Sequence, residues 1–316
     1  MFRAARTMAV VLTAGLAWLA SVSEARVEEP SPILQKISQS GTFTIGYRDG
    51  AIPFSYLDAD QQPIGFALDL CGLVAEKVRE QFGLSGIRID YKPVPPETRA
   101  AMLESGEVDL DCSLLPKTAE LIRDATTSIP IYVAEFRWLT PRQIRVERQD
   151  EGRTRSETKM PDTADDLLGK PVALTQGSKA GPLVLSLSVD RFLGLSLLYA
   201  KDAAAAFKLV ETGQAAAVID EDVALLALKA AAKNPDGFGF LNDAFPATSF
   251  VLAMRKDDKR FEELVNGVLA DAMRSGAYAE LYAKWFQSPI PPKNVNLAYA
   301  MPETVRRLVK DPPFTD

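Results

Sequence analysis

Apolar and polar residues follow strand-like and helix-like periods along most of the chain. Residues 42–46 and 87–91 alternate between apolar and polar side chains, which predicts two strands. Between them, apolar residues recur every three to four positions from about 69 to 81, which predicts a helix. Residues 57–66 read as a hairpin-like turn between short extended pieces.

A helix–glycine–strand unit occurs twice. Residues 97–105 are predicted to be a helix, Gly106 its left-handed C-terminal cap and residues 108–112 a strand. About one hundred residues later, a helix over 202–212, Gly213 and a strand over 215–219 repeat the pattern. Two copies predict two similarly built α/β lobes, and the frequent strand–helix alternation favours largely parallel sheets.

The C-terminal third adds a strand and two helices. A strand is expected over 250–254, an amphipathic helix over 258–274 that Gly276 ends, and a second helix over 278–286. The proline-rich residues 289–292 are expected to end regular structure and to leave a tail that runs to residue 316.

One internal segment breaks the periodic pattern. Residues 142–160 are almost wholly polar, with charges of both signs, which predicts a solvated loop. We interpret it as a surface insertion, and a docking surface for a partner is the alternative.

The N-terminus has the three parts of a secretory signal peptide. Arg3 and Arg6 precede an apolar run over 8–20, and small residues stand at the −3 and −1 positions of a cleavage after Ala25. The run is short for a bilayer core, although an uncleaved anchor is the alternative. We therefore expect export to a bacterial periplasm.

Composition removes several mechanisms. The chain has 316 residues, no histidine, two cysteines and a formal net charge of −6. These counts exclude histidine-based catalysis and histidine-bearing zinc sites, and the acidic balance argues against nucleic acid as a partner. No phosphate loop, dinucleotide motif or metal-ligand cluster occurs, so no cofactor or metal is expected. A binding protein, or an enzyme that uses carboxylates or lysine, remains.

Candidate ligand groups stand where predicted strands end. Arg48 follows the first strand, where ligands of open α/β sheets bind, and an arginine there can hold a carboxylate. Phe54 could stack on a ligand or belong to the core. Thr175 and Ser178 occupy a strand-to-helix turn that suits an anion or an ordinary helix cap. Glu221, in an acidic turn after another strand, could receive an ammonium or simply face solvent.

Two residue pairs carry further possibilities. Asp109 and Asp111 should point the same way from one strand, but Asp109 stands at the start of that strand, away from its carboxyl end, so an acid–base dyad is not expected. Cys71 and Cys112 could form a disulfide after export.

Several segments resemble family 3 extracellular solute-binding proteins. Residues 45–56 and 63–70 resemble the start of that family, and residues 276–286 its closing motif. Residues 288–296 resemble the end of its glutamate/aspartate-binding members. The resemblance implies an α/β, type II periplasmic-binding-protein fold with a ligand cleft between two lobes joined by crossing strands. The expected parts are a signal peptide 1–25, lobe 1 over 26–140 and 248–288, lobe 2 over 141–247, and a tail 289–316.

The resemblance also implies a role. Such a protein is not an enzyme: it captures a small anionic or zwitterionic solute, such as glutamate or aspartate, and delivers it to an inner-membrane ABC permease. We expect a monomer. Arg48 and Arg99 resemble arginines of the glutamate/aspartate subgroup, and Ser178, Lys179 and Glu221 match positions of the second lobe. The candidate ligand-binding residues are Arg48, Phe54, Arg99, Ser113, Thr175, Ser178, Lys179 and Glu221.

The chain departs from the family at the carboxylate grip. The positions of its usual threonine and arginine read Pro116 and Leu121, and Leu114 and Leu115 replace a hydroxyl-bearing cradle. Arg123 lies two residues on, about 200° around the helix. The subgroup's second-lobe histidine corresponds to Ala203. Two alternatives therefore stay open: an accessory or sensory protein that binds a partner or a different ligand, and an enzyme in which Glu221 or Lys179 acts as acid or base.

Overall fold

The computed structural model describes residues 31–82, 86–150, 153–243 and 245–313. The predicted signal peptide lies outside these residues. None of the helices in the described ranges has the length and apolar character needed to cross a membrane.

The first half of the chain forms a parallel sheet with helices around it. Strand β1 lies between β4 and β5 and pairs with both in parallel. The short strands β2 and β3 pair antiparallel, which confirms the predicted hairpin. The elements are α1 (Pro32–Ser40), β1 (Thr42–Tyr47), β2 (Tyr56–Leu57), β3 (Pro63–Ile64), α2 (Phe66–Phe82), β4 (Arg88–Pro93), α3 (Arg99–Ser105), β5 (Leu110–Pro116) and α4 (Ala119–Asp124).

A second parallel sheet follows in the middle of the chain. Strand β10 pairs with β11 and β12 in parallel, and β12 pairs antiparallel with β7. The elements are β7 (Tyr132–Pro141), β10 (Pro171–Thr175), α5 (Ala180–Asp190), β11 (Ser196–Ala200), α6 (Ala203–Glu211), β12 (Ala217–Glu221), α7 (Asp222–Ala231) and β13 (Phe238–Phe240), with 3-10 turns η1 (Ala164–Leu167) and η2 (Pro235–Gly237). The short strand β6 (Thr126–Thr127), which precedes β7, belongs to the first sheet, where it pairs with Ala253 and Met254.

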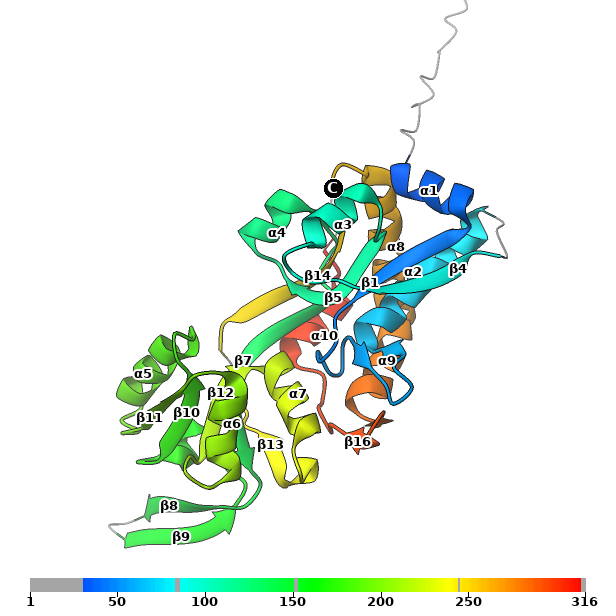
Figure 1. Ribbon diagram of the computed structural model, residues 1–316. Coiled ribbons are helices and arrows are strands. Elements are labelled where there is room, and N and C mark those ends of the chain that lie inside the picture. The colour runs from blue at the N-terminus through cyan, green and yellow to red at the C-terminus, as the bar shows by residue number, and fades with distance from the viewer. Residues whose placement is uncertain (1–30, 83–85, 151–152, 244, 314–316) are drawn as a thin grey trace, which may run out of the picture. The chain divides into compact units, whose positions relative to one another are not determined.

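Two antiparallel strands, β7 and β14 (Ala247–Met254), join the two halves (Figure 1). The resulting strand order is β11-β10-β12-β7-β14-β5-β1-β4. Chain direction places the carboxyl ends of β1 and β5 at one edge, and those of β10 and β12 at another. These two edges are where α/β sheets place their ligands.

The repeated helix–glycine–strand unit is confirmed. Gly106 after α3 and Gly213 after α6 both have left-handed backbones, with φ of 75° and 73°. Between the first unit and α2, Cys71 and Cys112 form a disulfide, with Cα atoms 6.7 Å apart. The bond ties α2 to β5, and it resolves the question that the sequence left open.

The polar segment over 142–160 is not the predicted loop. It forms an antiparallel ribbon of β8 (Ile144–Asp150) and β9 (Arg153–Lys159), paired from Ile144↔Lys159 to Asp150↔Arg153. The prediction was wrong because it relied on apolar alternation. A two-stranded ribbon satisfies its backbone through cross-strand hydrogen bonds and needs no apolar face, so its sequence can be polar throughout.

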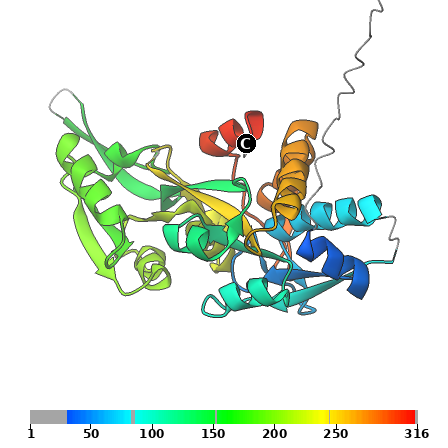
Figure 2. The ribbon, with the colours of Figure 1, turned by 90° about the horizontal axis from the view of Figure 1, so that it is seen from above.

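The expectation of an irregular C-terminal tail was also wrong. After α8 (Lys259–Ser275) and α9 (Ala277–Phe286), which confirm two predicted helices, the chain adds β15 (Pro289–Ile290), β16 (Val295–Asn296) and α10 (Glu303–Lys310). Helix α10 (red) lies beside α8 (orange) in Figure 2. Val305 and Leu308 are buried, so the prolines interrupt regular structure without ending it.

Candidate ligand-binding site

Arg99, the first residue of α3, is held by a buried carboxylate. Its Nε donates a hydrogen bond of 2.8 Å to Oδ2 of Asp111 on β5. Oδ1 of Asp111 accepts the backbone N–H of Ser113 at 3.0 Å and also the Ser113 hydroxyl. Burial raises the pKa of Asp111, and the bonds from Ser113 and Arg99 oppose that rise. All three donors favour the charged form that the arginine requires.

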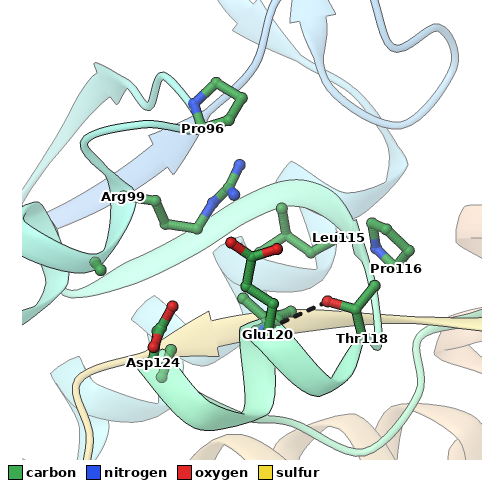
Figure 3. A pocket seen from close by; sticks show the side chains of 10 residues that line it. Pro96, Arg99, Leu115, Pro116, Thr118, Glu120 and Asp124 are labelled. Carbon is green, nitrogen blue, oxygen red and sulfur yellow. Dashed lines mark hydrogen bonds between the residues drawn. The ribbon is translucent and has the colours of Figure 1, made fainter.

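A pocket of about 200 Å³ lies beside Arg99, between α3 and α4. In Figure 3 the Arg99 guanidinium and the Glu120 carboxylate point into this space. Arg99 is the only basic residue among the described residues that line the pocket, and its walls are mostly apolar. The lining residues are Pro96, Arg99, Ala100, Leu115, Pro116, Thr118, Glu120, Leu121, Asp124 and Ala125.

At the position on α4 where the family resemblance implies an arginine, the pocket is lined by an apolar side chain. Leu121 lines the pocket, whereas Arg123 does not. The side chain of Arg123 is 69% exposed and pairs with Asp124 through two bonds, Nε–Oδ1 at 2.7 Å and Nη2–Oδ2 at 2.8 Å. Arg123 therefore does not replace the arginine–carboxylate contact that the family resemblance implies.

The carboxyl end of β5 is irregular at the same place. Leu114 has a φ of +61°, in the left-handed region that side chains rarely adopt. Opposite it, the pairing of β5 with β14 shifts register between Val251 and Ala253. Bulges of this kind often lie next to binding sites, where they redirect a strand. Sequence reasoning did not predict the bulge; its only signal was the departure from the family pattern at residues 114–116.

The other first-half candidates differ in accessibility. Arg48 is exposed and follows β1, whose Gly46 lies opposite Asp111 of β5, so Arg48 stands at the same sheet edge as Ser113. Ser113 itself is buried, with its hydroxyl committed to Asp111.

Phe54 lies in the core, which was the alternative to ligand stacking. It is fully buried and packs edge-on against Phe66, Tyr132 and Phe286. It therefore offers no exposed surface to a ligand in this structure.

The second-half candidates gather at the carboxyl ends of β10 and β12. Thr175 ends β10, and the Ser178 hydroxyl accepts the N–H of Ala180 at 3.1 Å, as a helix-capping serine does. Lys179 is exposed beside it. Burial raises the pKa of Glu221, whereas a hydrogen bond from Thr248 and the charge of Lys179 lower it. Glu221 and Lys179 are therefore close enough to interact.

The candidates thus form two clusters. Arg99 and Ser113 meet through Asp111, at the sheet edge where Arg48 follows β1, and Lys179 and Glu221 interact at the end of β12. No group of three or more histidine, cysteine, aspartate or glutamate residues in the described ranges could hold a metal ion. The chemistry present is that of charged hydrogen bonds to a small polar ligand.

Two α/β halves joined by paired strands, each with charged groups at its strand ends, define a two-lobed ligand-binding protein. The family model for bacterial extracellular solute-binding proteins, family 3, matches residues 43–288, and the chain belongs to this family.

Curated relatives cover nearly the whole chain. The L-glutamate/L-aspartate-binding protein of Pseudomonas aeruginosa is 30% identical over 286 residues, which is 90% of each chain. The glutamate/aspartate import solute-binding protein of Escherichia coli is 27% identical and covers 95% of this chain and 96% of its own.

Solved structures share the fold. The second substrate-binding domain of Lactococcus lactis GlnP, in an open conformation, has a TM-score of 0.61 at 18% identity and covers 78% of this chain and 95% of its own. An ancestral cationic amino acid solute-binding protein has a TM-score of 0.57 at 24% identity, with 80% and 99% covered. The predicted two-lobed, type II periplasmic-binding-protein fold is confirmed.

Proposed function

We propose that this family 3 solute-binding protein captures a small acidic amino acid, glutamate or aspartate, for an ABC transporter. It acts as a monomeric receptor in the periplasm and hands its ligand to an inner-membrane permease. Support comes from the relatives that are named for these two amino acids and from the basic groups at the candidate site. The proposal is a binding role and includes no catalysis.

The observation that carries the proposal is the arrangement around Arg99. Asp111 occupies its Nε, whereas its terminal nitrogens form no hydrogen bond with residues in the described ranges. A guanidinium held on one edge can present its other edge to a carboxylate through two parallel bonds. The pocket beside it has room for a small side chain or carboxylate.

Groups outside the pocket would complete the ligand's shell. Arg48 supplies a second cation for a ligand with two carboxylates. Glu221 supplies an anion for the ligand ammonium; burial and the charge of Asp220 raise its pKa, and Thr248 and Lys179 beside it oppose that rise. A ligand with two carboxylates and one ammonium would complement Arg99, Arg48 and Glu221, and the acidic Glu120 and Asp124 also line the pocket.

One observation favours a second candidate. Leu121 lines the pocket where the family implies an arginine, and Arg123 faces Asp124 instead. Without that bidentate contact, a ligand that lacks the α-amino acid group, such as a simple dicarboxylate, fits the remaining charges. The same fold would then serve an accessory or sensory role, or transport of a different solute.

Calorimetry on the purified protein tests both candidates. L-glutamate, L-aspartate, succinate and L-glutamine are titrated into wild type, Arg99→Met and the matched control Arg123→Met. We expect glutamate or aspartate to bind, Arg99→Met to weaken that binding about 10- to 100-fold, and Arg123→Met to leave it within about twofold, because a charged hydrogen bond contributes about 1.5–3 kcal/mol. Heat with succinate alone would favour the second candidate. Absence of heat with all four ligands, or equal losses in both variants, would contradict the proposal.

A further inference from the structure

We propose that Asp111 is a positioning residue: it orients the Arg99 guanidinium and thereby sets the affinity of the pocket for carboxylates. This inference rests on the proposed function and deepens it. It gives a role to a buried acid that was considered from the sequence only as half of an acid–base pair.

The geometry assigns one edge of the guanidinium to the protein. The side chain of Asp111 has no exposed surface, and that of Arg99 is 18% exposed. With Nε bonded to Oδ2, the Nη1 and Nη2 edge remains on the pocket side (Figure 3). A free arginine side chain samples many rotamers and loses that entropy when it is fixed. Fixing it before the ligand arrives removes that loss from the binding step.

The support behind Asp111 is rigid. It lies in the middle of the sheet, opposite Gly46 of β1 and Ala253 of β14. The next residue, Cys112, is bonded to Cys71 of α2. The carboxylate therefore cannot follow a moving arginine, and the arginine adopts the orientation that the carboxylate imposes.

The number of donors explains why a carboxylate is needed. Asp111 accepts from three groups: Arg99 Nε, the Ser113 N–H and the Ser113 hydroxyl. An asparagine offers one acceptor oxygen, and its amide nitrogen would face a donor. Asp111→Asn therefore leaves at least one donor unpaired and releases Arg99 from its fixed orientation.

Asp109 provides a matched control two residues earlier. It is 1% exposed, and its Oδ2 accepts from Lys36 Nζ at 2.7 Å and from the Thr44 N–H at 2.8 Å. Asp109→Asn likewise removes a buried carboxylate that holds a cation, but that cation is Lys36, which does not line the pocket, whereas Arg99 does. A general loss of stability should therefore affect both variants, and a loss of orientation only one.

The first measurement is the dissociation constant for L-glutamate and L-aspartate at a temperature where each variant is folded. We expect Asp111→Asn to weaken binding at least tenfold and Asp109→Asn to change it by less than threefold. In an Arg99→Met background, Asp111→Asn should cause no further loss, because there is no guanidinium left to orient. Equal effects of the two asparagine variants, or an undiminished effect without Arg99, would overturn the inference.

Two further measurements test the inference if Asp111→Asn folds poorly or if the protein binds a different ligand. Arg99→Lys keeps the positive charge but cannot bond Asp111 through one edge and the ligand through the other. This variant should therefore lose affinity for the amino acid as Asp111→Asn does. Wild-type affinity in Arg99→Lys would refute a role for orientation. The Arg99 Nε–H signal in nitrogen-15 NMR, assigned by its loss in Arg99→Lys, should exchange slowly with water in wild type and in Asp109→Asn and quickly in Asp111→Asn. If wild type binds neither amino acid, the proposed function fails, and this signal alone decides whether Asp111 orients Arg99: slow exchange in Asp111→Asn would overturn that role.

Discussion

Gly65, between β3 and α2, shows how one residue can limit the packing of a whole region. Its φ is +140°, and a Cβ placed there would lie 2.2 Å from the carbonyl oxygen of Phe54. Because that atom belongs to the backbone, it cannot rotate away. Phe54 is at the centre of the aromatic core, so any displacement reaches the packing of β7 and α9.

Replacing Gly65 by alanine should therefore lower the free energy of unfolding by about 2 kcal/mol or more. Gly72, inside α2, is the matched control because nothing lies within 4 Å of its added Cβ. There alanine should raise the free energy of unfolding by about 0.5–1 kcal/mol. Urea titration of both variants gives the comparison. Equal changes in the two would show that the close approach to Phe54 is not limiting.

Single residues of the site were only partly predictable from the sequence. Arg48 and Glu221 could be placed because they directly follow recognisable strands. Asp111 could not, because its role depends on contacts with Arg99 and Ser113 that no local pattern indicates, and because β5 continues beyond the predicted strand over 108–112 to Pro116 and bulges at Leu114. Tertiary pairing with β14 sets that length, and it leaves no period in the local sequence.

Among the elements, α2 and β5 are joined by the only covalent cross-link in the described ranges. The Cys71–Cys112 disulfide spans 41 positions and lies next to Asp111, so it supports the strand that carries the candidate site. Closing a loop of this length restricts the unfolded chain more than the folded one.

Replacing both cysteines by serine should lower the free energy of unfolding by about 4 kcal/mol, the chain-entropy value for a loop of this size. Guanidinium denaturation of the oxidised protein and of the double variant measures the difference. Wild type treated with reductant should approach the variant. Identical midpoints for oxidised and reduced wild type would show that the cross-link does not stabilise the fold.

Helices and strands were predictable where buried apolar residues recur at a regular spacing along the chain. Helix α8 has a buried face of Phe261, Val265 and Leu269, and its pattern was readable. The β8–β9 ribbon was missed because its stability lies in cross-strand backbone bonds rather than in an apolar face. Helix α10 was missed because it has only eight residues and follows a run of prolines. Its two buried positions are too few to show a helical spacing of apolar residues.

At the scale of the whole molecule, one buried carboxyl joins three distant segments. Oδ2 of Asp222, at the start of α7, accepts the hydroxyl of Tyr132 on β7 at 2.9 Å and that of Tyr299 in the C-terminal segment at 2.8 Å. β7 is one of the two strands that join the halves, and Tyr299 follows β16. The same C-terminal segment is held at Leu297, whose carbonyl accepts the buried Lys229 Nζ at 2.6 Å.

Burial raises the pKa of Asp222 to about 7, against the two tyrosine hydrogen bonds that lower it and the charge of Glu135 that raises it further. The acid is thus protonated in the folded protein up to near pH 7 but ionises near pH 4 when the chain unfolds. Between these values the folded state binds more protons than the unfolded state, so the contribution of Asp222 to stability falls as the pH rises from 4 to 7. Above pH 7 Asp222 is ionised in both the folded and the unfolded protein, so its contribution to stability no longer changes with pH.

Asp222→Asn should remove this slope, because asparagine keeps an acceptor for the tyrosine hydroxyls and has no proton to lose. The stability of the variant relative to wild type should therefore increase from pH 4 to pH 7 and then level off, with a total change on the order of 4 kcal/mol at most. Thermal unfolding in buffers from pH 4 to 8 measures it, and Asp60→Asn, at the exposed β2–β3 turn, serves as the control with the wild-type slope. A constant offset between Asp222→Asn and wild type across this range would mean that the carboxyl joining β7, α7 and the C-terminal segment is already ionised in the folded protein at pH 4.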